Sequence, residues 1–251
     1  MAKCTYCPVR IDSVILAVAA GNAADSLAAS AAAASARIVT AQVNIMGETV
    51  AVNLNLANAL MLLSAYLAGS ISPGYILVRL LRGIDLRQVR SGSLGATNVG
   101  RVLGRGGFSF TLTADLLKGA LVVWMARELA FPPDIIAATA AAVIIGHIWP
   151  LWLRFHGGKG IATSLGAIAV LDFGILLAGG AVLLALYLLT RQFLLSWVAT
   201  LITTPLLAGF LGFPMDRVVL LLTVAVIVLY AHRTNIRQAW CNAKQARQAK
   251  T

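Results

Sequence analysis

Long apolar runs, separated by short polar or charged breaks, follow one another from about residue 54 almost to the end of the chain. They cover roughly residues 54–81, 108–131, 135–153, 161–189, 193–213 and 218–230. Most reach the length of about 18 residues or more that a helix needs to cross the hydrocarbon core of a bilayer. The pattern therefore predicts an all-α polytopic membrane protein.

The run 161–189 can be one long helix or two shorter ones that meet near Asp172-Phe173-Gly174. Lys and Arg favour the cytoplasmic side of a membrane, so charge distinguishes the two counts. Only the broken run places Arg191 and the basic tail on the same side as Arg79, Arg82, Arg87 and Arg90. The sequence thus predicts seven transmembrane helices. The short one, of about a dozen residues, would reach only about 18 Å.

Residues 1–54 differ from the rest and contain an Ala/Ser-rich tract at 17–36. Two interpretations remain open: a signal-like leader, or an extension from too early a start codon with Met46 or Met61 as the true beginning. We expect three parts: this N-terminal extension or leader at 1–54, the membrane domain at 55–237 and a basic cytoplasmic tail at 238–251.

Composition excludes an ordinary soluble domain, because 59% of residues are hydrophobic and 12% charged, with a mean hydropathy of +0.85. The net charge of +11 resides mainly in the breaks between apolar runs. The positive charge therefore indicates how the helices are oriented in the membrane, and an attraction to anionic lipid or substrate, more than nucleic-acid binding. Cys4, Cys7 and Cys241 provide neither a disulfide framework nor a zinc site.

Three polar clusters interrupt the apolar pattern: the first at Ser91–Arg101, the second at Arg154–Ser164 and the third at His232–Arg237. The predicted topology brings all three to one membrane face, which the positive-inside bias makes cytoplasmic. Glycines permit close approach of the backbone, while hydroxyls, amides and arginine donate hydrogen bonds. That combination suits a phosphate.

Common enzyme motifs are missing. Gly157-Gly158-Lys159-Gly160 is not a Walker A loop, because no Ser or Thr follows the lysine directly, and nucleotide hydrolysis is not expected. Neither G-x-S-x-G nor H-E-x-x-H occurs. Asp115 and Lys118, spaced i to i+3, share a helix face and can partly neutralise each other. His147, at the end of an apolar run, is more typical of a structural than of a catalytic histidine.

The three clusters resemble those of the bacterial membrane glycerol-3-phosphate acyltransferases of the PlsY type, which use acyl phosphate as donor. Further matches, in the same order, include Gly69-Ser70-Ile71, Asp115 with Lys118-Gly119, and Gly146-His147. The resemblance implies a seven-helix fold with a cytoplasmic active site in the bacterial inner membrane. It also implies acyl transfer to the sn-1 hydroxyl of glycerol 3-phosphate, giving lysophosphatidic acid, by a monomer that needs no metal or other cofactor.

Site residues follow by position in the motifs. The resemblance implies catalytic roles for Ser91, Arg101, Lys159, His232 and Asn235. It implies substrate binding by Gly92, Ser93, Thr97, Asn98, Lys118, Gly157, Gly158, Gly160, Thr163 and Ser164.

Several positions depart from the family pattern. Ser93 stands where the first motif usually has Asn, and Ser72-Pro73 replaces a Pro-aromatic pair. Asn242 replaces a glycine, and Lys244 falls where the third motif normally carries Glu. Two alternatives therefore accompany the acyltransferase hypothesis: a diverged inactive paralogue and a small organic-phosphate transporter.

Overall fold

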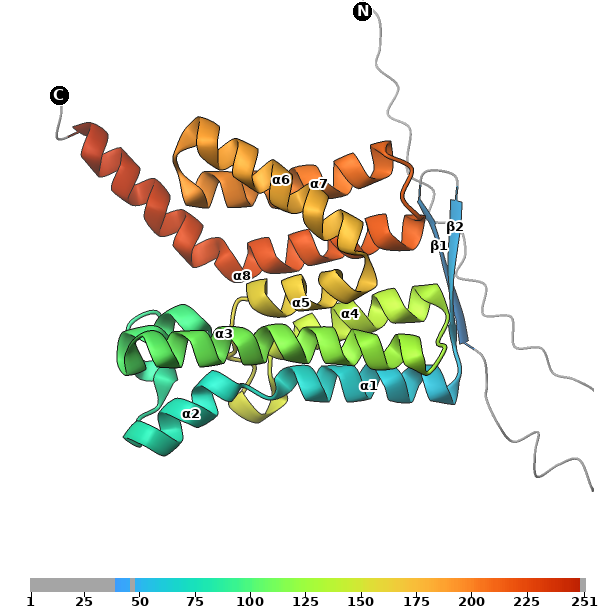
Figure 1. The fold of residues 1–251 in the computed structure, drawn as a ribbon, viewed down its shortest axis with the longest axis horizontal. Helices are drawn as coiled ribbons and strands as arrows, with labels where there is room; N and C mark the ends of the chain where they lie inside the picture. The colour runs from blue at the N-terminus through green and yellow to red at the C-terminus, as the bar shows by residue number, and fades with distance from the viewer. Residues whose placement is uncertain (1–38, 46–47, 249–251) are drawn as a thin grey trace, which may run out of the picture. The chain divides into compact units, whose positions relative to one another are not determined.

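The computed structural model describes residues 39–45 and 48–248, and helices make up most of them (Figure 1). The elements, in chain order, are β1 (Val39–Ile45), β2 (Glu48–Leu54), α1 (Leu56–Ser70), α2 (Pro73–Arg82), η1 (Leu86–Gln88), α3 (Ala96–Glu128), α4 (Pro133–Ile148), η2 (Leu151–Leu153), α5 (Ile161–Leu171), α6 (Phe173–Thr190), α7 (Phe193–Phe210) and α8 (Met215–Gln248). In the bundle, α1 packs on α4, α3 on α5, and α7 on both α6 and α8.

The helices α1 and α2 are two parts of one apolar span, Leu56–Arg82. The break lies at Ile71 and Ser72, both of which are extended, and Pro73 opens the second part. Proline disfavours a helical conformation in the residue before it, which explains the interruption. With this span counted once, the described residues contain seven helical membrane elements. The predicted seven-helix fold is confirmed.

The run 161–189 divides where the charges predicted. α5 ends at Leu171 after 11 residues, and α6 begins at Phe173. The Asp172 carboxylate caps α6 by accepting a hydrogen bond of 3.1 Å from the Ile175 amide. Five spans in the described part of the chain are long and apolar enough to cross a membrane, whereas α5 is among the shorter ones.

The start of α3 differs from the expectation. The hydrophobic pattern placed a helix from about Phe108, but the helix begins at Ala96 and is interrupted at Gly104, which has φ 73° and ψ −162°. The segment before Gly104 folds back, so that Gly107 lies against Val99. The second half of the first polar cluster is therefore helical. Apolar patterning missed this turn because polar residues and arginines occupy it.

Glycines bring the central helices into close contact. A methyl group at any of four glycines would overlap a backbone carbonyl of the neighbouring helix. The pairs are Gly69 with Val143, Gly146 with Tyr66, Gly119 with Thr163, and Gly166 with Leu116. In a membrane, where lipid is as apolar as a side chain, such close backbone packing is a main source of helix association. These contacts join α1 to α4 and α3 to α5, the helices that carry most of the site.

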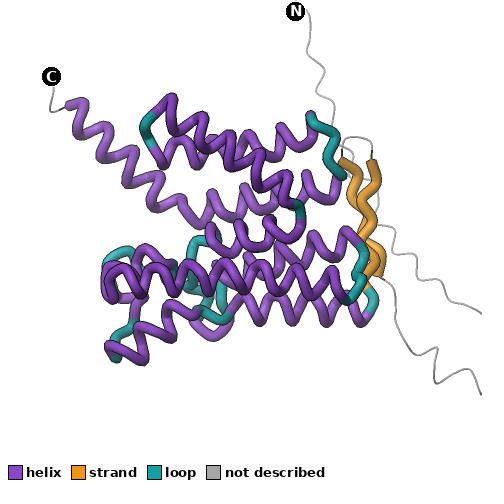
Figure 2. The backbone as a smooth tube through the Cα atoms, in the orientation of Figure 1, coloured by secondary structure: helices purple, strands orange, loops and turns teal. Residues whose placement is uncertain are grey.

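A β-hairpin precedes the membrane domain, within the part of the chain for which the sequence suggested no element. Val39 pairs with Leu54 and Ile45 with Glu48, antiparallel. Figure 2 shows the two strands near the start of α1. Residues 1–38, and with them most of the expected leader, lie outside the described residues. At the other end α8 continues to Gln248, so the backbone of the basic tail extends the last helix.

Candidate active site

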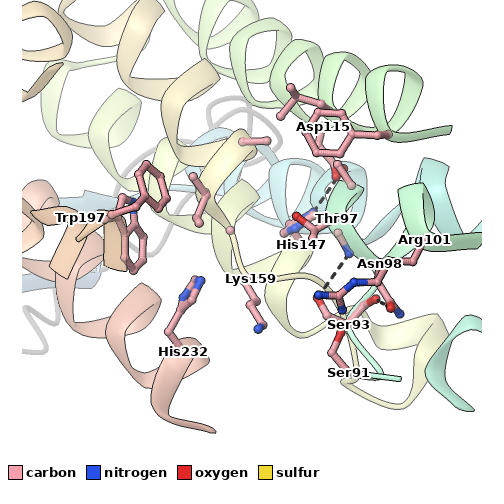
Figure 3. Close-up of a pocket in the computed structure, with 18 residues that line it drawn as sticks. Ser91, Ser93, Thr97, Asn98, Arg101, Asp115, His147, Lys159, Trp197 and His232 are labelled. Carbon is pink, nitrogen blue, oxygen red and sulfur yellow. Dashed lines mark hydrogen bonds and ion pairs between the residues drawn. The ribbon is translucent and has the colours of Figure 1, made fainter. Parts of the chain in front are cut away.

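A cavity of about 800 Å³ lies where α3 begins, α4 ends and α5 begins (Figure 3). All three polar clusters contribute to its lining. They supply Ser91, Ser93, Gly95, Ala96, Thr97, Asn98 and Arg101 from the first, Lys159, Gly160, Ile161 and Ala162 from the second, and His232 from the third. The fold thus assembles one site from segments that are far apart in the sequence.

The loop of the first cluster is shaped by Asn98. This buried side chain donates its amide hydrogens to the carbonyls of Ser93 at 2.9 Å and Val89 at 3.1 Å, with Leu86 at 3.4 Å. Gly92 has φ +66°, a conformation that glycine adopts at little cost. Asn98 therefore holds the loop that carries the serines of the first cluster to the cavity.

An ion pair braces this loop from outside. Arg87 binds Asp85 at 2.6 Å and donates a hydrogen bond of 3.3 Å to the Leu153 carbonyl in η2. The hydrogen bond from the Arg87 guanidinium lowers the pKa of the Asp85 carboxyl to about 2. The pair is therefore charged at neutral pH and ties η1, which precedes the first cluster, to η2 after α4.

The glycine loop of the second cluster lies against the end of α4. The amides of Gly157 and Gly158 donate to the carbonyls of Ile148 and His147, each at 3.1 Å. A methyl group at Gly157 would overlap the His147 carbonyl, and one at Gly158 the His147 ring. Lys159 is thus the residue of this loop that presents a long side chain to the cavity, directly before the N-terminus of α5.

Two cations dominate the electrostatics of the cavity. Neither Arg101 nor Lys159 makes an ion pair or hydrogen bond within the described part of the chain. Burial lowers the pKa of the Lys159 ammonium below its ordinary value, and the nearby Arg101 guanidinium lowers it further. A bound anion would offset both effects. The amides at the N-terminus of α5 add partial positive charge on the same side.

His232 enters from α8. Its Nδ1 lies 2.8 Å from the Val228 carbonyl, and its ring packs on Trp197 with centroids 4.5 Å apart. A carbonyl only accepts hydrogen bonds, so Nδ1 carries a proton and donates it to this contact. Asn235 follows one turn later on α8, but its side chain lies outside what the structure describes.

Not all predicted substrate-binding residues line the cavity. Gly92, Gly157 and Gly158 shape the loops through their backbone, and Thr163 and Ser164 are buried within α5. Lys118 lies behind the cavity wall, where it pairs with Asp115 at 3.0 Å as the sequence predicted. The lining residues Ser93, Thr97, Asn98 and Gly160 are the ones placed to meet a ligand directly.

Sequence reasoning did not assign Asp115, His147 or the aromatic residues Phe108, Phe193 and Trp197 to the site, yet all five line the cavity. The i to i+3 spacing of Asp115 and Lys118 indicated that both side chains lie on one face of a helix. It did not indicate which part of the molecule that face contacts. Among the described residues, no group of three His, Cys, Asp or Glu side chains is arranged to hold a metal ion.

The fold and the site define a multi-pass membrane protein with a cavity that contains two cationic side chains, Arg101 and Lys159. The family model for glycerol-3-phosphate acyltransferase matches residues 59–242. This chain belongs to the glycerol-3-phosphate acyltransferase family.

Individual relatives agree with this assignment. Glycerol-3-phosphate acyltransferase 1 of Desulfitobacterium hafniense is 42% identical over 187 residues, which cover 74% of this chain and 93% of the relative. The glycerol-3-phosphate acyltransferase of Synechococcus elongatus is 42% identical over 182 residues, covering 69% of this chain and 87% of the relative.

Solved structures are similar too. Crystal structures of PlsY (YgiH), an integral membrane glycerol 3-phosphate acyltransferase, match in a glycerol 3-phosphate form and a lysophosphatidic acid form. The first is 31% identical with a TM-score of 0.66, and the second 29% with 0.64. Each alignment covers 74% of this chain and 93% of the other.

Proposed function

We propose that this protein transfers a fatty acyl group from an acyl phosphate to the sn-1 hydroxyl of glycerol 3-phosphate, with lysophosphatidic acid as product. One observation carries the proposal: Arg101 and Lys159, from two distant clusters, line the same cavity beside the N-terminus of α5 without a carboxylate partner among the described residues. Two phosphate-bearing substrates require such a set of donors. Family membership supports the same reaction.

The reaction needs little chemistry from the protein. The sn-1 oxygen attacks the acyl carbonyl carbon, the bond from that carbon to the phosphate oxygen breaks, and inorganic phosphate leaves. A phosphate oxygen of the substrates takes the hydroxyl proton, so a strong protein base is unnecessary. Positioning and electrostatic stabilisation then supply most of the rate. Arg101 and Lys159 hold the phosphates, while Ser91, His232 and Asn235 position the hydroxyl and the carbonyl.

The acyl chain enters from the bilayer. Phe108, Leu112, Phe193 and Trp197 form the apolar part of the cavity lining, and they offer a hydrocarbon chain a surface next to the cationic part. An acyl phosphate can therefore keep its chain among apolar side chains and its headgroup at Lys159.

We infer that the cavity faces the cytoplasm, since Arg79, Arg82, Arg90 and Arg154 lie in the segments at the cavity end of the bundle. The membrane domain at 55–237 carries the activity, and the extension at 1–54 and the tail at 238–251 lie outside it.

The test is formation of lysophosphatidic acid by the purified protein from radiolabelled glycerol 3-phosphate. Acyl phosphate is the expected donor, with acyl-CoA and acyl carrier protein thioesters supplied in parallel. Product from acyl phosphate alone supports the proposal and shows that Ser93 and Lys244 are tolerated. Folded protein that yields no product from any donor contradicts it and favours an inactive paralogue. Uptake of an organic phosphate into proteoliposomes without lipid product favours a transporter.

A further inference from the structure

A second cavity lies between α2 and the start of α3, two helices that pack against each other (Figure 1). Its volume of about 490 Å³ falls within the range of about 300–1,000 Å³ that is usual for small-molecule sites. It is lined by Leu77, Leu81 and Arg82 of α2 and by Leu103, Gly106, Gly107 and Phe110 of α3. The active-site cavity shares none of these lining residues. We call the second cavity the α2–α3 groove.

The apolar part of the α2–α3 groove is open to the surroundings of the protein. Leu81 is 63% exposed and Phe110 is 51% exposed, and both belong to spans that are long and apolar enough to cross a membrane. A methyl group added at Gly106 would meet nothing within 4 Å, so this side of α3 leaves space next to the backbone. In a bilayer such a space is filled by lipid chains, because the hydrocarbon core contains no water.

Arg82 provides the charged end of the groove, as the last residue of α2. Its guanidinium is exposed and makes no ion pair or hydrogen bond within the part of the chain that the structure describes. The segment 79–105 contains six arginines and a single acidic residue, Asp85, which already pairs with Arg87 at 2.6 Å. An unpaired cation beside an apolar groove between helices complements the anionic headgroup of a lipid.

The order of charged and apolar residues along the groove matches the order of parts in a phospholipid. Arg82 lies at the end of the apolar span Leu56–Arg82, whereas Leu77 lies more than one helical turn nearer the middle of that span. Phe110 lies beyond the fold-back at Gly104, within the long part of α3. A headgroup at Arg82 therefore leaves its acyl chains next to residues of the membrane-spanning segments.

We propose that the α2–α3 groove binds one anionic diacyl phospholipid of the surrounding bilayer. Its headgroup phosphate lies at Arg82, and an acyl chain lies along Leu81 and Phe110. Because the groove lies against the fold-back at Gly104, the bound lipid fills the space between α2 and this turn and stabilises their contact. The site is separate from the proposed acyl transfer and does not depend on it.

The test is native mass spectrometry of the full-length protein in a neutral detergent, titrated with dioleoyl phosphatidylglycerol or dioleoyl phosphatidylcholine. The two lipids have the same acyl chains and differ in net charge, and we expect phosphatidylglycerol to bind more tightly. Arg82→Ala should weaken its binding about 5- to 20-fold, the effect of one cationic contact with an anionic headgroup, whereas Arg82→Lys should retain it. Equal affinity of the wild type for the two lipids overturns the inference.

Two controls locate the bound lipid. Arg90→Ala removes another exposed arginine of the same segment that does not line the groove, and it should leave the affinity unchanged. Equal weakening by Arg82→Ala and Arg90→Ala would reveal diffuse attraction to positive charge and overturn the inference. Lys159→Ala should also keep the lipid, since Lys159 lines the active-site cavity. Loss of the lipid in this variant would place it in the active site instead.

A substitution at Gly106 tests the apolar part of the groove. The leucine side chain in Gly106→Leu would occupy the open space next to α3, and we expect the affinity for phosphatidylglycerol to fall at least about tenfold. Gly180→Leu adds the same side chain to α6, also where nothing lies within 4 Å, and should leave the affinity unchanged. Unchanged binding in Gly106→Leu overturns the assignment to this groove. If Gly106→Leu fails to fold, the comparison of Arg82→Ala with Arg90→Ala still decides the question.

Discussion

At the scale of single residues, the strongest prediction concerns the contribution of Lys159 to activity. It is half-buried, lacks an anionic partner among the described residues and follows a loop held against α4. We expect Lys159→Ala to lower kcat/KM by about 100- to 1,000-fold, the usual loss when one preorganised electrostatic group is removed from an active site. Arg82→Ala removes an exposed positive charge of α2 and should leave the rate unchanged. Full activity of Lys159→Ala in the formation of lysophosphatidic acid would contradict the role given to it.

The same lysine predicts a pH dependence. Burial and Arg101 lower the pKa of Lys159, so it loses its proton at a lower pH than an ordinary lysine does. Phosphate binding requires the charged form, and the KM for the phosphate substrate should therefore rise as pH increases through this lowered pKa. Lys159→Arg, whose charge persists at high pH, should move the rise to higher pH. An identical KM profile in both proteins would show that another group is responsible.

Residue type and local sequence identified some cavity residues but not others. Arg101 and Lys159 stand out because charged groups beside apolar runs are costly unless they are used. His147 does not, since a histidine at the end of an apolar run looks the same whether it faces lipid, a helix or a ligand. Its Nδ1 lies 2.9 Å from the ammonium of Lys118, which is 29 positions away in the chain. Only the packing of α3 against α4 reveals that contact.

At the scale of helices, the α3–α5 contact predicts a strong effect of one methyl group. In Gly119→Ala the new Cβ would overlap the Thr163 carbonyl, and a backbone cannot yield as a flexible side chain can. We expect a loss of about 1–3 kcal/mol, typical of overpacking, seen as a lower unfolding temperature in detergent. Gly180→Ala makes the same change on α6 with nothing within 4 Å and should be neutral or slightly stabilising. Equal stability of the two variants would refute the tight contact.

Helix limits were predictable where charge and hydrophobicity changed together. Asp172 marks the junction of α5 and α6 because a carboxylate interrupts an apolar run and then caps the next helix. The fold-back at Gly104 was not predictable in this way. It depends on the contact of Gly107 with Val99, a tertiary interaction that leaves no periodic signal in the surrounding polar residues.

At the scale of the whole molecule, the direction of the bundle in the membrane follows from its charges. Arg90 precedes α3 at the cavity end, whereas Glu128 ends the same helix; both side chains are exposed. If the positive-inside bias sets the orientation, Arg90 lies in the cytoplasm and Glu128 outside. In a cysteine-free background, a membrane-impermeant maleimide should label Glu128→Cys in intact cells, and Arg90→Cys only after the cells are permeabilised. The reverse pattern would place the cavity on the outer face, away from a cytoplasmic supply of acyl phosphate. Labelling of both positions in intact cells would mean that the segment between them does not span the membrane.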